Sequence, residues 1–295
     1  MRRLMIAALV VLLLAAPTVT ARTERLTILS TNFSEVHILG EAVKILLQEN
    51  LGVEVEHIKD FSAQLLLHNA MLAGDADAAI YHTGTQFTGV LGMEVTDEWK
   101  DREKVFAYVN EQYNERFETT WLKPFGFNST YAITVRKELA EEHNLKTMSD
   151  LQGLSETMTL GMDAVFRDRP GDGYEAMNEM YGLKWGRPLS MDYGLIYRAT
   201  ATGDVDAAVA YATDGRIPAM DLVALEDDLG FFPPYDCSLV VKNEILEKYP
   251  EIEEILMPLF GNLDDETMAY YNQLVDVEQM DFREVARILV NDFIK

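Results

Sequence analysis

The sequence predicts an α/β protein built from two similar units, each a mixed sheet flanked by helices, with a ligand site in the cleft between them. Three observations support this fold class. Strand-like and helix-like segments alternate along the chain, as they do in βαβ units. The alternation restarts in the second half. Finally, "GDADAAIYHTGT" at residues 74–85 has a near copy, "GDVDAAVAYATDG", at residues 203–215, which indicates a repeated structural unit.

The first unit follows directly from its hydrophobic pattern. Residues 25–31 are β-branched and apolar, and the next segment has apolar residues at helical spacing up to Gly52, which is placed to end a helix. An alternating strand, a helix ending at Gly74 and a short strand follow. In chain order the predicted elements are strand 25–31, helix 34–51, strand 53–59, helix 61–73 and strand 77–81.

The second unit repeats this order, and helices close the chain. The predicted elements are strand 158–163, helix 173–181, helix 193–202, strand 206–211 and C-terminal helices over 244–261, 266–276 and 282–294. Because open α/β sheets bind ligands beyond the carboxyl ends of their strands, the two repeated strands should each present a loop to one cleft. When the two copies of the repeat are aligned, His82 corresponds to Tyr211.

Charge and composition exclude some classes of partner. The chain has 295 residues, 49 acidic and 25 basic, and a net charge of -24. Such a surface repels phosphate backbones, so we expect no nucleic-acid partner. Beyond this exclusion, the acidic charge indicates only that the protein is kept in solution.

The first 21 residues are predicted to be a secretory signal that is cleaved after Ala21. Two arginines precede a short apolar run, and small residues follow it. The apolar run is short for a membrane span, although an anchor is the alternative. We therefore expect a periplasmic location for the mature protein.

Sequence motifs for catalysis are missing. The chain has no G-x-S-x-G elbow, phosphate-binding glycine loop, H-E-x-x-H or C-x-x-C motif. The single cysteine, Cys237, is predicted to be a buried structural thiol. The aspartates of the repeated phrase lack the further ligands of a calcium loop. We predict a protein that is not an enzyme and needs no metal or cofactor.

Tyrosines are the side chains that indicate a ligand class. Tyr131, Tyr211 and Tyr235 fall at predicted strand ends and junctions. The faces of tyrosine rings attract cations, above all alkylated ammonium groups, which lose their water at low cost. An alternative is that these tyrosines belong to the core, where the residue is also common.

Several long segments resemble one family of proteins. They are "STNFSEVHILGE", "HTGTQFTG", "GFNSTYAITVR", "FRDRPGDGY", "MDYGLIYRATATGDVDAAVAYATDGRI", "EDDLGFFPPY" and "GNLDDETMAYYNQLVD". In these segments the chain resembles the substrate-binding proteins of ABC importers for osmoprotectants such as glycine betaine, carnitine and choline. The resemblance covers nearly the whole chain after the signal.

The resemblance implies a type II periplasmic binding protein fold with two lobes that close over the ligand. Lobe 1 would be discontinuous, comprising residues 22–128 and 232–295, and lobe 2 would comprise residues 129–231. The chain would cross between the lobes near Gly126–Ser129 and near Phe231–Tyr235. Glycine and proline at these crossings suit hinges, because they set unusual backbone angles.

The resemblance also assigns the ligand-binding residues. The family holds its cation with four tyrosines, of which three correspond to Tyr131, Tyr211 and Tyr235, while His82 occupies the place of the fourth. Thr85 corresponds to a polar ligand contact. Arg169 corresponds to an arginine that can bind a carboxylate in a bidentate manner.

Some positions depart from the family pattern. Val36, Ser129 and Val165 stand where the family has polar or acidic residues. A histidine wall binds cations less well than tyrosine, and a protonated His82 would repel the ligand, so binding should weaken as the pH falls through the histidine range. Tyr81 could replace His82 only if the loop were shifted.

The predicted function is that of a periplasmic, monomeric receptor that binds a quaternary amine and delivers it to an ABC permease in the inner membrane. Two alternatives remain at this point. One is a receptor of the same fold for another solute, such as an amino acid or a polyamine. The other is a sensor that reports the ligand to a membrane kinase.

Overall fold

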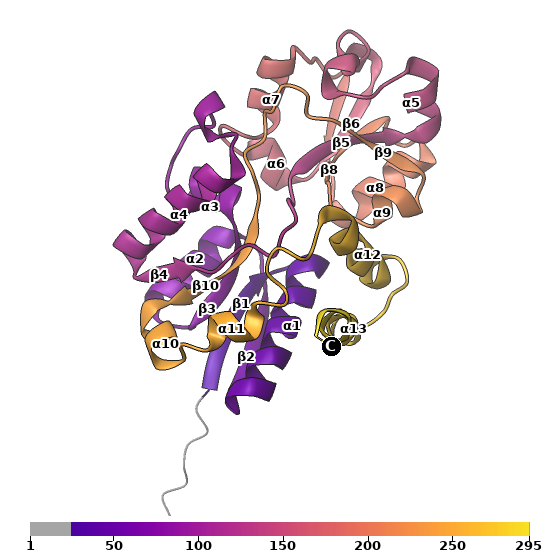
Figure 1. Ribbon diagram of the computed structural model, residues 1–295. Helices are drawn as coiled ribbons and strands as arrows, with labels where there is room; N and C mark the ends of the chain where they lie inside the picture. Colours follow the sequence, from indigo (N-terminus) through magenta and orange to yellow (C-terminus); the bar gives the residue numbers. More distant parts are fainter. Residues whose placement is uncertain (1–24, 295) are drawn as a thin grey trace, which may run out of the picture.

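The computed structural model describes residues 25–294, so the predicted signal at residues 1–21 lies outside the described part. Its strands form two five-stranded sheets, one in the lower and one in the upper half of Figure 1. The strands of the first sheet are β1 (Arg25–Thr31), β2 (Glu54–Phe61), β3 (Ala78–His82), β4 (Thr119–Trp121) and β10 (Cys237–Lys242). The strands of the second are β5 (Tyr131–Arg136), β6 (Thr159–Met162), β7 (Arg187–Ser190), β8 (Ala207–Tyr211) and β9 (Leu222–Leu225).

Helices cover both sheets. Those of the first half are α1 (Ser34–Leu51), α2 (Gln64–Ala73), α3 (Thr83–Gly89), α4 (Arg102–Phe117), α5 (Lys137–His143) and α6 (Ala164–Asp168), with 3-10 turns at Asp97–Trp99 and Met148–Leu151. Those of the second half are α7 (Tyr174–Tyr181), α8 (Tyr193–Thr202), α9 (Arg216–Ala219), α10 (Asn243–Lys248), α11 (Ile252–Leu256), α12 (Asp265–Asp276) and α13 (Phe282–Phe293), and a third 3-10 turn spans Ser155–Thr157. None of the helices within residues 25–294 is long and apolar enough to cross a membrane.

The two sheets have the same topology. Their strand orders are β2-β1-β3-β10-β4 and β7-β6-β8-β5-β9, so β3 and β8 hold equivalent central places. Each of these two strands pairs in parallel on one side and antiparallel on the other, with β10 and β5 as the antiparallel partners. This equivalence explains why the sequence repeats one phrase.

The repeated phrase builds the same turn in both sheets. Gly74 and Gly203 end the preceding helices in the left-handed conformation, with φ of 86° and 82°. Asp77 then accepts a hydrogen bond from the backbone N–H of Thr27 at 2.7 Å, and Asp206 accepts one from Thr159 at 2.8 Å. The repeated aspartates therefore join neighbouring strands.

The predicted helix over residues 244–261 is wrong in one respect. It is divided into α10 and α11, which are separated around Tyr249–Pro250. Proline has no backbone N–H and its ring clashes with the preceding turn, so the helix cannot continue through this position. Helix α13 lies against α1, and buried residues of α1, α11, α12 and α13 belong to one hydrophobic core with the first sheet.

The chain links the two sheets through residues 122–130 and 226–236. These two links lie side by side at an isolated antiparallel bridge between Asn128 and Asp236. Arg102 of α4 donates hydrogen bonds to the backbone oxygens of Gly126 and Phe127 and to the carboxylate of Asp236. Both links are thus held from one side by the same guanidinium.

Candidate functional site

A cleft of about 600 Å³ is lined by residues of both sheets and of their connecting loops. All six residues that the sequence indicated for ligand binding line it: His82, Thr85, Tyr131, Arg169, Tyr211 and Tyr235. They come from six places: the ends of β3 and β8, the start of β5, the N-terminal turn of α3, and two loops. The fold therefore brings the predicted set together.

The three tyrosines form adjoining walls. The centroid of the Tyr131 ring lies 4.9 Å from that of Tyr211 and 5.7 Å from that of Tyr235. The Tyr131 and Tyr235 planes are at 89° to each other, like two walls at a corner. Arg169 Cζ lies 5.7 Å from the centroids of both rings, so the two aromatic faces are turned toward one cationic group, the guanidinium.

Tyr235 is fixed in this corner by its neighbours. Its hydroxyl donates to the buried carboxylate of Asp172, and its backbone N–H donates to Asn128 Oδ1 at 2.7 Å. Gly84 has no side chain, and a Cβ there would lie only 2.8 Å from the Tyr235 ring. Glycine at this position lets the ring lie against the start of α3.

His82 and Tyr81 point to opposite faces of β3, as successive residues of a strand do. His82 lines the cleft, whereas Tyr81 packs with Tyr113 and Trp121 in a separate core on the other face. His82 therefore faces the cleft without any shift of the loop. Its ring centroid lies 5.8 Å from that of Phe33.

Arg169 lies against the tyrosines with part of its hydrogen-bonding capacity free. Its Nε donates to Asp172 at 2.7 Å. Its two terminal nitrogens make only long contacts, 3.4 Å to Tyr131 Oη and 3.5 Å to Thr88 Oγ1. Weak bonds of this length are readily exchanged for a bidentate bond to a carboxylate.

Two aromatic walls of the cleft were missed by sequence reasoning. Phe33 stacks on Tyr211, with ring centroids 6.1 Å apart and planes at 15°, and the Tyr193 centroid lies 5.1 Å from that of Tyr211. Phe33 could have been found, because it follows the carboxyl end of β1 just as His82 ends β3. Tyr193 begins α8, and no signal in the sequence places the start of that helix at the cleft.

The interpretation of Val36 as a lost polar ligand contact is wrong. Val36 lies in the first turn of α1 and is fully buried in the core of the first sheet. The preceding residue, Glu35, lines a separate pocket of about 240 Å³ that adjoins the cleft at Phe33, Ser129 and Tyr211. By contrast, Ser129 and Val165 do line the cleft.

Burial keeps the tyrosines of the cleft neutral. Loss of solvent raises the pKa of Tyr131, and raises those of Tyr211 and Tyr235 well above the ordinary value. The walls of the cleft therefore act through their ring faces rather than through phenolate charge.

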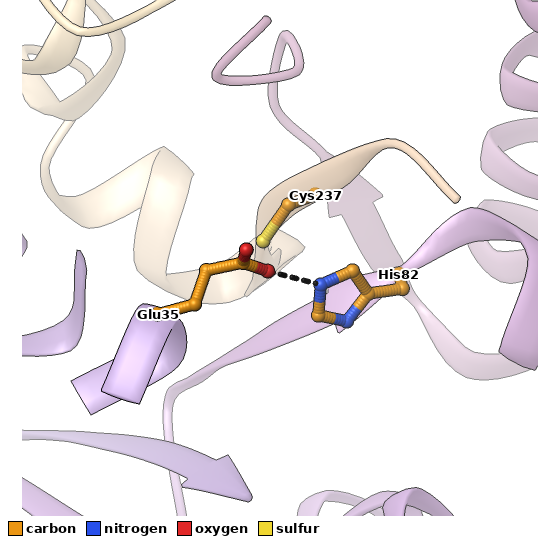
Figure 2. Close-up of side chains that lie close together, drawn as sticks. All are labelled: Glu35, His82 and Cys237. Carbon is orange, nitrogen blue, oxygen red and sulfur yellow. Dashed lines mark hydrogen bonds and ion pairs between the residues drawn. The ribbon is translucent and has the colours of Figure 1, made fainter. Parts of the chain in front are cut away.

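Glu35, His82 and Cys237 meet beside the cleft (Figure 2). One oxygen, nitrogen or sulfur atom of each lies within 4.8 Å of the others. His82 Nε2 lies 3.1 Å from Glu35 Oε1, and Thr213 Oγ1 donates to Glu35 Oε2 at 2.7 Å. Burial, together with Glu35 and Asp236, raises the pKa of the Cys237 thiol, which opposes the thiolate that a metal would need. We assign no metal to this cluster.

An aromatic cleft between two lobes of this topology defines a solute-binding protein. Residues 24–292 match the family model of the substrate binding domain of the ABC-type glycine betaine transport system, and the chain belongs to this family.

Similar proteins carry related descriptions. The chain is 38% identical over 244 residues to the carnitine transport binding protein OpuCC of Listeria monocytogenes, covering 82% of this chain and 78% of that one. It is 30% identical over 264 residues to the ergothioneine transport permease/ergothioneine binding protein EgtU of Helicobacter pylori, covering 89% of this chain and 46% of that longer one. A solved glycine betaine/carnitine/choline ABC transporter structure superposes with a TM-score of 0.80 at 32% identity, covering 90% of this chain and 98% of that one.

Proposed function

We propose that this chain captures a quaternary ammonium osmoprotectant of the glycine betaine, choline or carnitine type and delivers it to an ABC permease in the inner membrane. The observation that carries the proposal is the corner of tyrosine faces in the cleft. Trimethylammonium groups are bound by such faces without a hydrogen bond. The family membership and the descriptions of the similar proteins support the same ligand class.

The polar end of the ligand is assigned to Arg169 and Thr85. Arg169 points its terminal nitrogens at the same cleft and is held in place through Asp172, so it can receive the carboxylate of a betaine. Choline has a hydroxyl group in place of the carboxylate and would use Thr85. Closure would be driven by contacts that both lobes make with the bound ligand.

We further propose that the chain binds its ligand without transforming it, as a periplasmic monomer exported by the signal at residues 1–21. Ser30, His57 and Glu41 do form a hydrogen-bonded series with distances of 2.8 and 3.1 Å. They are buried between β1, β2 and α1, and the Ser30 side chain has no exposed surface. A substrate cannot reach this serine, so the series is structural.

The test is calorimetric titration of purified residues 22–295, stripped of ligand by unfolding and refolding. The panel is glycine betaine, choline, carnitine, proline betaine and ergothioneine, with an amino acid and a polyamine as the alternative solutes. Binding of at least one quaternary amine, with no chemical change in the recovered compound, is the expected result. Binding of only the amino acid or the polyamine by folded protein would overturn the proposed ligand class.

A further inference from the structure

A chain of hydrogen bonds runs from the cleft through the first lobe to its other face. In order, it joins His82 to Gln64 of α2, Gln86 of α3, Tyr113 of α4 and His68 of α2. On the cleft side it continues from His82 through Glu35 to Thr213, which follows β8. This series of hydrogen bonds therefore runs from Thr213, in a loop that follows a strand of the second sheet, to a groove lined by His68 and Tyr113.

The bonds in this chain have a direction. The Tyr113 hydroxyl donates to Gln86 Oε1, and Gln86 Nε2 donates to Gln64 Oε1. This leaves Gln64 Nε2 facing His82 Nδ1 at 3.0 Å. An amide nitrogen only donates, so Nδ1 must accept and carries no proton. The remaining proton of the ring is then on Nε2, which lies 3.1 Å from Glu35 Oε1 and donates to it.

We propose that Gln64, Gln86 and Tyr113 are positioning residues that hold His82 as the neutral Nε2–H tautomer. The wall that His82 contributes to the cleft is then uncharged. Glu35, which lines the adjoining pocket, then accepts a hydrogen bond from a neutral ring. This inference rests on the proposed function, because it explains how a histidine can replace a tyrosine beside a bound quaternary amine.

The groups facing His82 fit this assignment. Glu35 comes from α1, while Asp236 and Cys237 precede and begin β10. Asp236 forms an ion pair with Arg102, and Cys237 is a buried thiol with a raised pKa. Neither of them therefore offers Nδ1 a negatively charged hydrogen-bond acceptor. On that side His82 faces the neutral amide of Gln64. The Glu35 carboxylate is 2% exposed and accepts from both His82 and Thr213.

Protonation of His82 at Nδ1 would require each hydrogen bond between His82, Gln64, Gln86 and Tyr113 to reverse its direction. A proton on Nδ1 would meet the Gln64 amide nitrogen, so Gln64 would have to turn its oxygen toward the ring. Gln86 would then turn as well, and the Tyr113 hydroxyl would have to donate to His68 Nδ1, which is 3.5 Å away. That bond is long, whereas the Tyr113 hydroxyl lies 2.5 Å from Gln86 Oε1 in the existing direction. The existing direction therefore gives the Tyr113 hydroxyl the shorter hydrogen bond.

The first test is NMR of the histidine side chains in the ligand-free full chain. Long-range ¹H–¹⁵N spectra distinguish the two neutral tautomers from the imidazolium, and a His82→Gln variant assigns the signals. The expected result is a neutral Nε2–H ring at pH 8.0. A neutral Nδ1–H ring or an imidazolium would overturn the inference. Because no ligand is added, this result is independent of whether a quaternary amine binds.

The second test uses a variant far from the ligand. Tyr113→Phe removes the hydroxyl that sets the direction of the chain while keeping the ring that packs in the core. The matched control is Tyr81→Phe, because Tyr81 packs 6.1 Å from Tyr113 but its buried hydroxyl has no hydrogen-bond partner among residues 25–294. The tautomer of His82 and the affinity for choline are measured for both variants and for the unaltered protein at pH 8.0.

We expect the Nε2–H tautomer of His82 in the unaltered protein and in Tyr81→Phe, because the Tyr113 hydroxyl sets the direction of the hydrogen bonds in both. In Tyr113→Phe this donor is lost and the Gln86 and Gln64 amides can turn, so we expect a mixture of the two neutral tautomers. The same single tautomer in both variants would overturn the positioning role. Absence of choline and betaine binding, with the tautomer as assigned, would instead refute the proposed function alone.

Discussion

Tyr131 and Tyr211 lie directly opposite each other on the antiparallel strands β5 and β8, with ring centroids 4.9 Å apart. This pair sets the geometry of the cleft, because residues paired across antiparallel strands share one face of the sheet. The equivalent pair in the first sheet is Cys237 and His82, on β10 and β3. The second sheet thus contributes both residues of its pair to the cleft, whereas the first sheet contributes His82 alone.

We predict that the aromatic face of Tyr211, rather than its bulk or its hydroxyl, holds the cation. Tyr211→Phe should retain choline binding within about threefold, whereas Tyr211→Leu should weaken it by about tenfold or more, as expected for a lost cation–π contact of 1–2 kcal/mol in a desolvated site. Calorimetry on the two variants measures this. Equal losses in both would show that the ring face is not the binding element.

We predict that Arg169 separates betaines from choline. Arg169→Lys keeps the charge beside Asp172 but loses the planar fork, so glycine betaine and carnitine should bind about tenfold to a hundredfold more weakly. Choline has no carboxylate and should change by less than about threefold. Parallel titrations of one variant with both ligands provide the internal control. A similar loss for choline would assign Arg169 to the packing of the tyrosines instead.

More of the residues that line the cleft could be predicted from the sequence than of the residues that hold them in place. Strand ends are readable from periodicity, so the repeat alone places His82 and Tyr211 at the cleft, whereas Tyr131 is placed there by the family resemblance. Tyr193 could not, because its position depends on where α8 begins relative to β8, which is a matter of tertiary packing. Val36 was misplaced by one residue, and on a helix one residue turns a side chain by about 100°, from the pocket beside the cleft into the core.

The hydrogen-bond chain behind His82 was also beyond sequence reasoning. Gln64, Gln86 and Tyr113 lie on three different helices, and nothing in their local patterns indicates that they meet. Polar residues in such helices are equally expected on the exposed face. The two links between the sheets show the same limit: their glycines and prolines indicate hinges, but not that Arg102 binds both.

We predict that alkaline pH destabilises the fold through its buried tyrosines. The pKa values of Tyr211 and Tyr235 are raised well above 10 in the folded protein, so the unfolded chain releases protons first as the pH rises. Their contribution to stability is present below about pH 10 and falls above it by up to about 1.4 kcal/mol per pH unit for each tyrosine. Urea unfolding between pH 8 and 11 measures this, and an unchanged free energy over that range would contradict it.

We predict that Gly126 is required in the first link. Its φ is 133°, and a Cβ would lie 2.7 Å from the backbone oxygen of Leu263. Gly126→Ala should therefore lower the free energy of unfolding by about 1–3 kcal/mol. Gly89→Ala is the matched control, because Gly89 has an ordinary φ and no atom within 4 Å of the added methyl. Chemical denaturation of both variants makes the comparison, and equal stabilities would show that the link relaxes.

The most direct measurement is a crystal structure of residues 22–295 with glycine betaine bound. It gives the distance from the ligand's quaternary nitrogen to each ring centroid. We predict that this nitrogen lies within about 6 Å of the Tyr131, Tyr211 and Tyr235 centroids, with the carboxylate on Arg169. A ligand bound with its nitrogen away from these rings, or outside the cleft, would contradict the aromatic cage.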